Sequence, residues 1–116
     1  MKKYWLLLIV FLFPIIINAE AITYNICKSG CEYNDLETVS NEINSLTNVD
    51  DVIVNFKDSE LYDGNLYYIS EHDLNSFTVN GNNSTINAID IEHTKTTIVN
   101  DLSVKQGAFL FCFWNA

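Results

Sequence analysis

Two short segments combine histidine with carboxylates, the residue types that serve general acid–base catalysis and metal binding. One is Glu71-His72-Asp73, and the other is Glu92-His93. Histidine changes its charge near neutral pH, so beside a carboxylate it can act as a base or as a ligand. Both segments fall near turn-forming residues, where a histidine usually faces solvent. We therefore expect two solvated surface clusters that do not converge on an active site.

Acidic residues are concentrated between positions 50 and 63, and carboxylates are ligands that calcium prefers. Calcium takes about six to eight oxygens from a compact loop. This stretch lacks the EF-hand pattern, so we expect solvated acidic turns and no metal site. The carboxylates concerned are Asp50, Asp51, Asp58, Glu60 and Asp63.

Other catalytic motifs are missing from the sequence. It contains no G-x-S-x-G, no H-E-x-x-H and no glycine-rich loop before a helix. The 116 residues include 15 acidic and 6 basic side chains, all six of them lysines, for a net charge of -9. Nucleic-acid binding requires clustered basic residues, so this class is excluded. We expect no enzymatic activity, no catalytic residues, no cofactor and no metal.

Residues 1–21 have the organisation of a secretory signal peptide. Two lysines precede an apolar run that ends at Ile17, and Ala19-Glu20-Ala21 places small residues around a cleavage site. We expect cleavage after Ala21, with a cut after Ala19 as the alternative. A retained anchor is disfavoured, because the run is shorter than the roughly 20 apolar residues of a membrane span. The sequence thus predicts a secreted or cell-surface protein that meets a membrane only through an uncleaved signal.

Export sets the expectations for the cysteines and for glycosylation, because disulfides persist outside the cytosol. Gly30 allows a sharp turn between Cys27 and Cys31, and we expect these two cysteines to be bridged. Cys112 is then unpaired, and a buried thiol, an intermolecular bridge and a partner beyond residue 116 all stay open. Asn82 and Asn83 each begin an N-glycosylation sequon.

One amphipathic helix is expected from Asp35 to Leu46. Asn34 is the expected N-cap, and Glu37 lies three residues later, as a capping box requires. Apolar residues at spacings of three, four and three give this helix one apolar face. They are Leu36, Val39, Ile43 and Leu46.

After Val49, short β-rich runs alternate with turns rich in Asn, Asp and Gly, including a turn at 80–83. A Val-Asn pair closes three runs, at Val54-Asn55, Val79-Asn80 and Val99-Asn100. The nearly constant separation of these pairs indicates one structural unit used three times. Stacked in parallel, such units would bury an apolar column and let the asparagines bond to each other along the stack.

Three segments resemble secreted right-handed parallel β-helix proteins of the pectin-lyase-like fold. Residues 26–36, ICKSGCEYNDL, resemble the opening of these proteins, which leads into a helix that covers the amino end. Residues 77–86 and 97–107 resemble two of their coils. The nearest similarity is to adhesin-like and polymorphic-outer-membrane-protein-like surface proteins. The resemblance implies an all-β, right-handed parallel β-helix of about three coils with an N-terminal amphipathic capping helix.

These observations divide the chain into a signal peptide (1–21), a strand, cysteine turn and capping helix (22–48), and coils (49–116). The coils end on an apolar run without a cap, so we expect a truncated β-helix whose C-terminal edge can self-associate. We expect an exported, non-catalytic protein of adhesion or interaction, with a surface glycan or protein as partner. The alternative is the N-terminal fragment of a lyase- or hydrolase-like polysaccharide-active β-helix enzyme.

Overall fold

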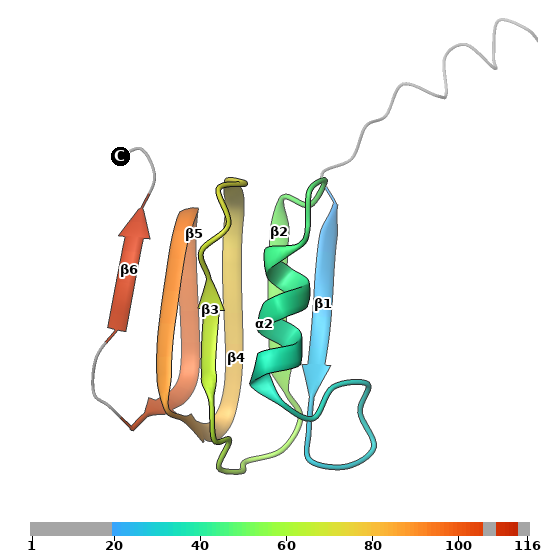
Figure 1. Cartoon of the computed structure of the whole chain (residues 1–116). Helices are drawn as coiled ribbons and strands as arrows, with labels where there is room; N and C mark the ends of the chain where they lie inside the picture. Colours follow the sequence, from blue (N-terminus) through green and yellow to red (C-terminus); the bar gives the residue numbers. More distant parts are fainter. Residues whose placement is uncertain (1–19, 106–108, 114–116) are drawn as a thin grey trace, which may run out of the picture.

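A computed structural model describes residues 20–105 and the backbone of 109–113. Strands make up 56% of this part, and they form one curled parallel sheet, a half-barrel, as an all-β chain should (Figure 1). No helix among the described residues has the length and hydropathy to cross a membrane. The elements are β1 (Ala21–Ile26), α2 (Leu36–Asn44), β2 (Asp51–Phe56), β3 (Asn65–Tyr68), β4 (Leu74–Ile86), β5 (Ala88–Val104) and β6 (Phe109–Phe113).

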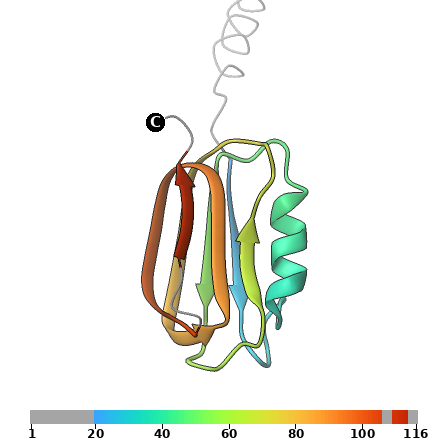
Figure 2. The same ribbon diagram turned by 60° about the vertical axis from the view of Figure 1, so that its left-hand side comes forward.

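The sheet has the order β1-β2-β4-β5-β3, with β6 also paired to β5, and every pair is parallel. Strand β5 belongs to both sides of the curl, because its first part pairs with β3 and β6 and its second part with β4. The strand changes direction near His93, which has a left-handed φ of 57°. Figure 2 shows the resulting curved sheet with α2 on one flank.

The predicted register of the Val-Asn repeat is confirmed. Val54 pairs with Val79, which pairs with Val99, and the three asparagines that follow pair in the same order. The chain therefore returns to the same place in the sheet at each repeat. Alternate residues of a strand point to opposite faces, so the valines form an inward column and the asparagines an outward row.

The prediction of a turn at residues 80–83 is wrong, because this stretch lies within strand β4. Strand β4 continues through this stretch as a bulge, with a register shift against β5 between Asn80 and Ser84. Asn82 and Asn83 have φ values of 50° and 64°. Asparagine tolerates this left-handed conformation better than most residues, so the strand changes direction without ending.

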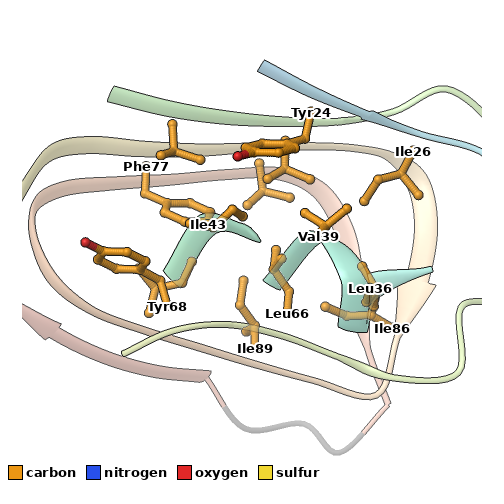
Figure 3. Close-up of a cluster of buried hydrophobic side chains, with 14 of the residues drawn as sticks. Tyr24, Ile26, Leu36, Val39, Ile43, Leu66, Tyr68, Phe77, Ile86 and Ile89 are labelled. Carbon is orange, nitrogen blue, oxygen red and sulfur yellow. The ribbon is translucent and has the colours of Figure 1, made fainter. Parts of the chain in front are cut away.

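The core lies between the curled sheet and α2 (Figure 3). Inward residues of β2 and β4 are fully buried, and the apolar face of α2 covers them. The labelled side chains in Figure 3 include Tyr24 and Ile26 of β1, Leu36, Val39 and Ile43 of α2, Leu66 and Tyr68 of β3, Phe77 and Ile86 of β4, and Ile89 of β5.

Helix α2 has the predicted apolar face but a different start. The N-cap is Asp35, not Asn34: its backbone is extended, and its Oδ1 accepts a hydrogen bond from the Thr38 amide at 2.7 Å. Glu37 consequently lies in the first turn and completes no capping box with Asn34. A carboxylate one residue closer to the helix satisfies the free amide and also complements the helix dipole. Leu46 lies beyond the helix, partly buried against the core.

Two polar residues of α2 occupy the edge of β3 that no described strand covers. The Ser40 hydroxyl accepts from the Tyr67 amide at 3.1 Å and donates to the Asn65 carbonyl. Asn44 donates to the Tyr67 carbonyl at 3.0 Å and accepts from the amides of residues 69 and 70. These side chains replace the hydrogen bonds of a neighbouring strand. The helix therefore satisfies backbone hydrogen-bonding groups at this edge of β3 and also covers the core.

Replacing Asn44 with alanine should destabilise the protein by about 1–3 kcal/mol, because three backbone groups of the β3 segment lose their partner. Thermal unfolding measures the loss. Asn48→Ala, at an exposed asparagine after α2, is the matched control and should leave the midpoint within about 2 °C. Equal midpoints for the two variants would contradict the edge-closing role of Asn44.

Candidate functional site

The predicted Cys27–Cys31 disulfide is present, with the two Cα atoms 5.5 Å apart. The loop between the two cysteines contacts the turn after β2. The Lys28 amide donates to the Asp58 carboxylate at 2.8 Å, and the Lys28 Nζ lies 4.3 Å from the centre of the Tyr62 ring. The Tyr62 hydroxyl donates to the same carboxylate, at 2.5 Å. The bridge therefore anchors the segment that connects β1 to α2.

The outward side of β1, β2, β4 and the second part of β5 is the most regular surface of the described chain, and we call it the outer face. Its residues form three rows across the four strands, because the register is continuous. The first row is Ala21, Asp51, Ser76 and Thr96; the second is Thr23, Ile53, Thr78 and Ile98; the third is Asn25, Asn55, Asn80 and Asn100.

The third row is an asparagine ladder. Asn100 donates to the Oδ1 of Asn80 at 3.0 Å, and Asn80 donates to the Oδ1 of Asn55 at 2.7 Å. This confirms the predicted bonding of asparagines along the stack. Each bond uses one of two amide hydrogens and one acceptor position, so every member keeps hydrogen-bonding capacity for a partner.

A shallow cleft of about 420 Å³ runs beside the ladder. Gly81 contributes backbone to its wall, and Lys57 and Asp101 place one charge of each sign on it. The cleft is thus nearly neutral and rich in amides, which suits a ligand with hydroxyl or amide groups better than an ion. The lining residues are Asn55, Phe56, Lys57, Asn80, Gly81, Asn82, Asn100 and Asp101.

The outer face carries little charge compared with the whole protein. Among its three rows only Asp51 is ionisable, and its carboxylate already accepts from the Ser76 hydroxyl at 2.6 Å. The chain as a whole carries -9. A neutral face of hydroxyls, amides and two isoleucines on an acidic protein is a surface that a neutral partner can approach without desolvating charges.

The two histidine segments come together, which corrects the expectation that they stay apart. The Nδ1 of His93 lies 3.6 Å from the Asp73 carboxylate. His72 is half-buried, not solvated, and its Nε2 lies 2.6 Å from the Val49 carbonyl. The contact arises because the bend of β5 lies beside the start of β4, in the register Leu74 to Thr94. These contacts connect two corners of the fold.

The acidic residues between 50 and 63 are distributed over separate structural contacts. Asp51 bonds β4, Asp58 bonds the cysteine loop and Tyr62, and Asp63 accepts from Asn87 at 2.9 Å. In the part of the chain that the structure describes, no three side chains of His, Cys, Asp or Glu are grouped to hold a metal ion.

Asp90 and Glu92 form a carboxylate pair that the sequence analysis missed. Both lie on β5, two residues apart and hence on the same side of the strand. Partial burial raises the pKa of Asp90, and the charge and hydrogen bond of Glu92 raise that pKa further. The alternation Ile89-Asp90-Ile91-Glu92 was the available signal, because it places both carboxylates opposite the buried isoleucines.

Replacing Asp90 with asparagine should raise the unfolding temperature at pH 7. A raised folded-state pKa means that Asp90 favours folding when protonated, and this contribution is lost as the pH rises through that pKa. The gain should therefore vanish near pH 3, where the carboxyl is protonated in both states. Thermal unfolding between pH 3 and 7 checks this. Glu71→Gln removes the same charge from an exposed position, and an equal gain there would contradict the assignment.

Several other polar and aromatic residues lie at different places in the fold. Tyr67 and Tyr68 point to opposite sides of β3, with Tyr68 in the core and the Tyr67 hydroxyl bonded to Asn41. The predicted glycosylation residues Asn82 and Asn83 are both exposed, and Asn82 lines the cleft. Cys112 lies in β6 opposite Glu92, and the contacts of its thiol lie outside the described residues.

Comparison of the chain with protein-family models, with curated proteins and with solved structures finds no match. The outer face, the ladder and the cleft are therefore the features of the molecule that bear on its function.

Proposed function

We propose that this is an exported, non-catalytic interaction protein, at the cell surface or secreted, whose outer face binds a neutral surface glycan. The same proposal takes the curled sheet as part of a right-handed parallel β-helix that α2 caps at its amino end. The observation that carries the proposal is the composition of the outer face: three regular rows with a single ionisable residue, on a chain of net charge -9.

The chemistry of the face favours a glycan over a protein partner. Amides and hydroxyls dominate the rows and match the hydrogen-bonding groups of sugars. Large exposed apolar side chains are few there, with Ile98 at 44% exposure the main one. Protein interfaces usually centre on aromatic or aliphatic anchors, and the outer face presents none of the aromatic kind.

Export is the second part of the proposal, and most of the predicted signal (1–21) lies outside the described residues. Its last residue, Ala21, begins β1, and Glu20 before it bonds to the start of β2. Ala21 pairs with Asp51, and the Glu20 carbonyl accepts from the amides of Asp50 and Asp51 at 3.0 and 3.2 Å. These bonds favour the cut after Ala19 over the cut after Ala21. The intact mass of the secreted product measures which residue comes first, and Glu20 is the expected one.

An array of neutral and anionic oligosaccharides tests the binding proposal directly. We expect neutral glycans to bind and anionic ones to be repelled by the acidic protein. Thr78→Arg places a bulky side chain at the centre of the outer face and should abolish the signal. Thr47→Arg, exposed after α2, adds the same charge elsewhere and should preserve it. Binding that survives Thr78→Arg, or an array without any signal, would overturn the proposal.

A second candidate function is supported by the Asp90–Glu92 pair. Two neighbouring carboxylates, one of them partly buried with a raised pKa, are the groups that glycoside cleavage employs. On this view the chain contributes coils to a polysaccharide-active β-helix enzyme. Release of reducing ends from neutral and acidic polysaccharides, lost in Asp90→Asn, would favour it. The absence of cleavage across such a panel would leave the binding function.

A further inference from the structure

The two end strands of the stack differ in how their outer edges are satisfied. On its side away from β4, β5 has no described strand partner after Thr94, which pairs with Phe113. On its side away from β2, β1 bonds among the described residues only at Ile26, which bridges to Tyr33. Each end of the stack therefore presents backbone amides and carbonyls without a partner among the described residues, and these can accept one more parallel strand.

The inward column is incomplete at the β5 end. Val52, Val54, Phe77 and Val79 in the middle strands have 0% exposure. Thr97 and Val99 continue the same two lines of the column on β5 but are only half-buried, as are Leu102 and Val104 further along the strand. At the other end, Tyr24 is 3% exposed because the Tyr33 ring packs against it at 5.3 Å. A further strand beside β5 would therefore bury more of the half-exposed inward side chains than a further strand beside β1.

The side chains of the two edges match in type and in register. Two inward lines of paired residues cross the four strands. The first is Ile22, Val52, Phe77 and Thr97, and the second is Tyr24, Val54, Val79 and Val99. A β1 strand laid beside β5 in the next position would place Ile22 against Thr97 and Tyr24 against Val99. Apolar residues would then meet apolar or half-buried ones along the same inward side.

The asparagine ladder supplies a polar match at the same contact. Asn100 donates to Asn80, while its own Oδ1 accepts no hydrogen bond from a described side chain. Asn25 lies in the same row at the opposite end and makes no side-chain hydrogen bond among the described residues. The next position in the stack brings Asn25 of one molecule beside Asn100 of another, where the ladder can continue.

Charge complementarity is the third match. The residues directly before the first row of the outer face also lie side by side across the stack. Glu20 lies beside Asp50 at the β1 end of the stack, and Lys95 lies on β5 at the opposite end. Neither side chain forms an ion pair with a described residue. In a chain with only six basic residues, a lysine opposite a glutamate at this point offsets part of the repulsion between two acidic molecules.

We propose that the open edge of β5 binds the β1 edge of a second copy of this chain, in parallel and head to tail. Such a contact joins two different surfaces, so it repeats and forms open chains of molecules instead of a closed dimer. About four residues of each strand pair directly, Ile22–Asn25 against Thr97–Asn100, because Tyr33 occupies the edge at Ile26, and Glu20 and Lys95 lie two residues before this pairing. The contact is therefore small, and association should appear at about 0.1–1 mM protein.

Sedimentation velocity over a concentration series tests this proposal with the exported chain. The wild type should show an average mass that rises steadily past that of two copies. Asn100→Asp is exposed, adds a carboxylate to the contact and should weaken association at least about tenfold. The added substitution Asn25→Lys should restore association by pairing the new charges across the contact. Asn48→Asp adds the same charge at an exposed position after α2 and should change nothing.

A wild type that stays monomeric at about 1 mM would overturn the proposal. So would a mass that saturates at two copies, which indicates a symmetric dimer, or a double variant that fails to recover. Thermal unfolding of each variant within about 2 °C of the wild type would confirm that a changed mass comes from the contact and not from unfolding. Glycan binding is measured in a separate experiment, so a failure of the self-association proposal can be distinguished from a failure of the glycan-binding proposal.

Discussion

Replacing Val39 with aspartate should lower the unfolding temperature by at least about 12 °C. Val39 has 0% exposure and lies in the middle of the α2 face that covers the core. A carboxylate at this site has no partner, and its burial should destabilise the fold by about 3–5 kcal/mol. For a domain of this size each kcal/mol corresponds to about 4–8 °C. Thermal unfolding followed by circular dichroism measures the shift.

Asn41→Asp is the matched control for this variant, because it places the same charge on the exposed side of the same helix. The Tyr67 hydroxyl donates to the Asn41 Oδ1 at 2.6 Å, and a carboxylate keeps that acceptor. We expect a change below about 1 kcal/mol. If Val39→Asp unfolds at the same temperature as Asn41→Asp, α2 does not cover the core as described.

Gly81→Ala should destabilise the protein by about 2–3 kcal/mol. A Cβ atom on Gly81 would lie 2.4 Å from the Asp101 carbonyl oxygen and 2.8 Å from the Leu102 Cα. These are backbone atoms of the next strand, so no side-chain rotation relieves the contact. The bulge of β4 would have to move away from β5, which also strains the neighbouring Asn80–Asn100 bond. Urea denaturation measures the loss of unfolding free energy.

Gly64→Ala separates this steric effect from the general effect of replacing glycine. A Cβ on Gly64 would lie 3.6 Å from the Leu36 Cβ, which is an ordinary van der Waals contact. The substitution also reduces the freedom of the unfolded chain, so the variant should be unchanged or up to about 1 kcal/mol more stable. Equal destabilisation at both glycines would argue against the close approach of the two strands at Gly81.

The features predicted correctly from the sequence are those that local spacing determines. Helical periodicity identified Leu36, Val39 and Ile43, and short separation identified the Cys27–Cys31 bridge. The Val-Asn repeat predicted a long-range register, because three copies of one pattern at nearly constant separation indicate equivalent positions. Pairing between Val54, Val79 and Val99 follows from that repeat.

The features that sequence reasoning missed depend on contacts between distant residues. Ser40 and Asn44 read as ordinary polar positions of a helix, and only their placement beside β3 turns them into edge partners. Asp73 and His93 are far apart in the sequence and meet because β5 bends beside the start of β4. The N-cap was misplaced by one residue, since Asn34 and Asp35 are both good capping residues and only the backbone decides between them.

At each Val-Asn repeat the chain returns to the sheet and adds a strand in parallel. Nuclear Overhauser effects between backbone protons of isotope-labelled protein test this parallel arrangement most directly, because parallel and antiparallel neighbours bring different protons together. We expect contacts linking Val54 with Val79 and Val79 with Val99 in the parallel pattern. Antiparallel contacts between these segments, or none at all, would contradict the stacked rows, the asparagine ladder and the outer face together.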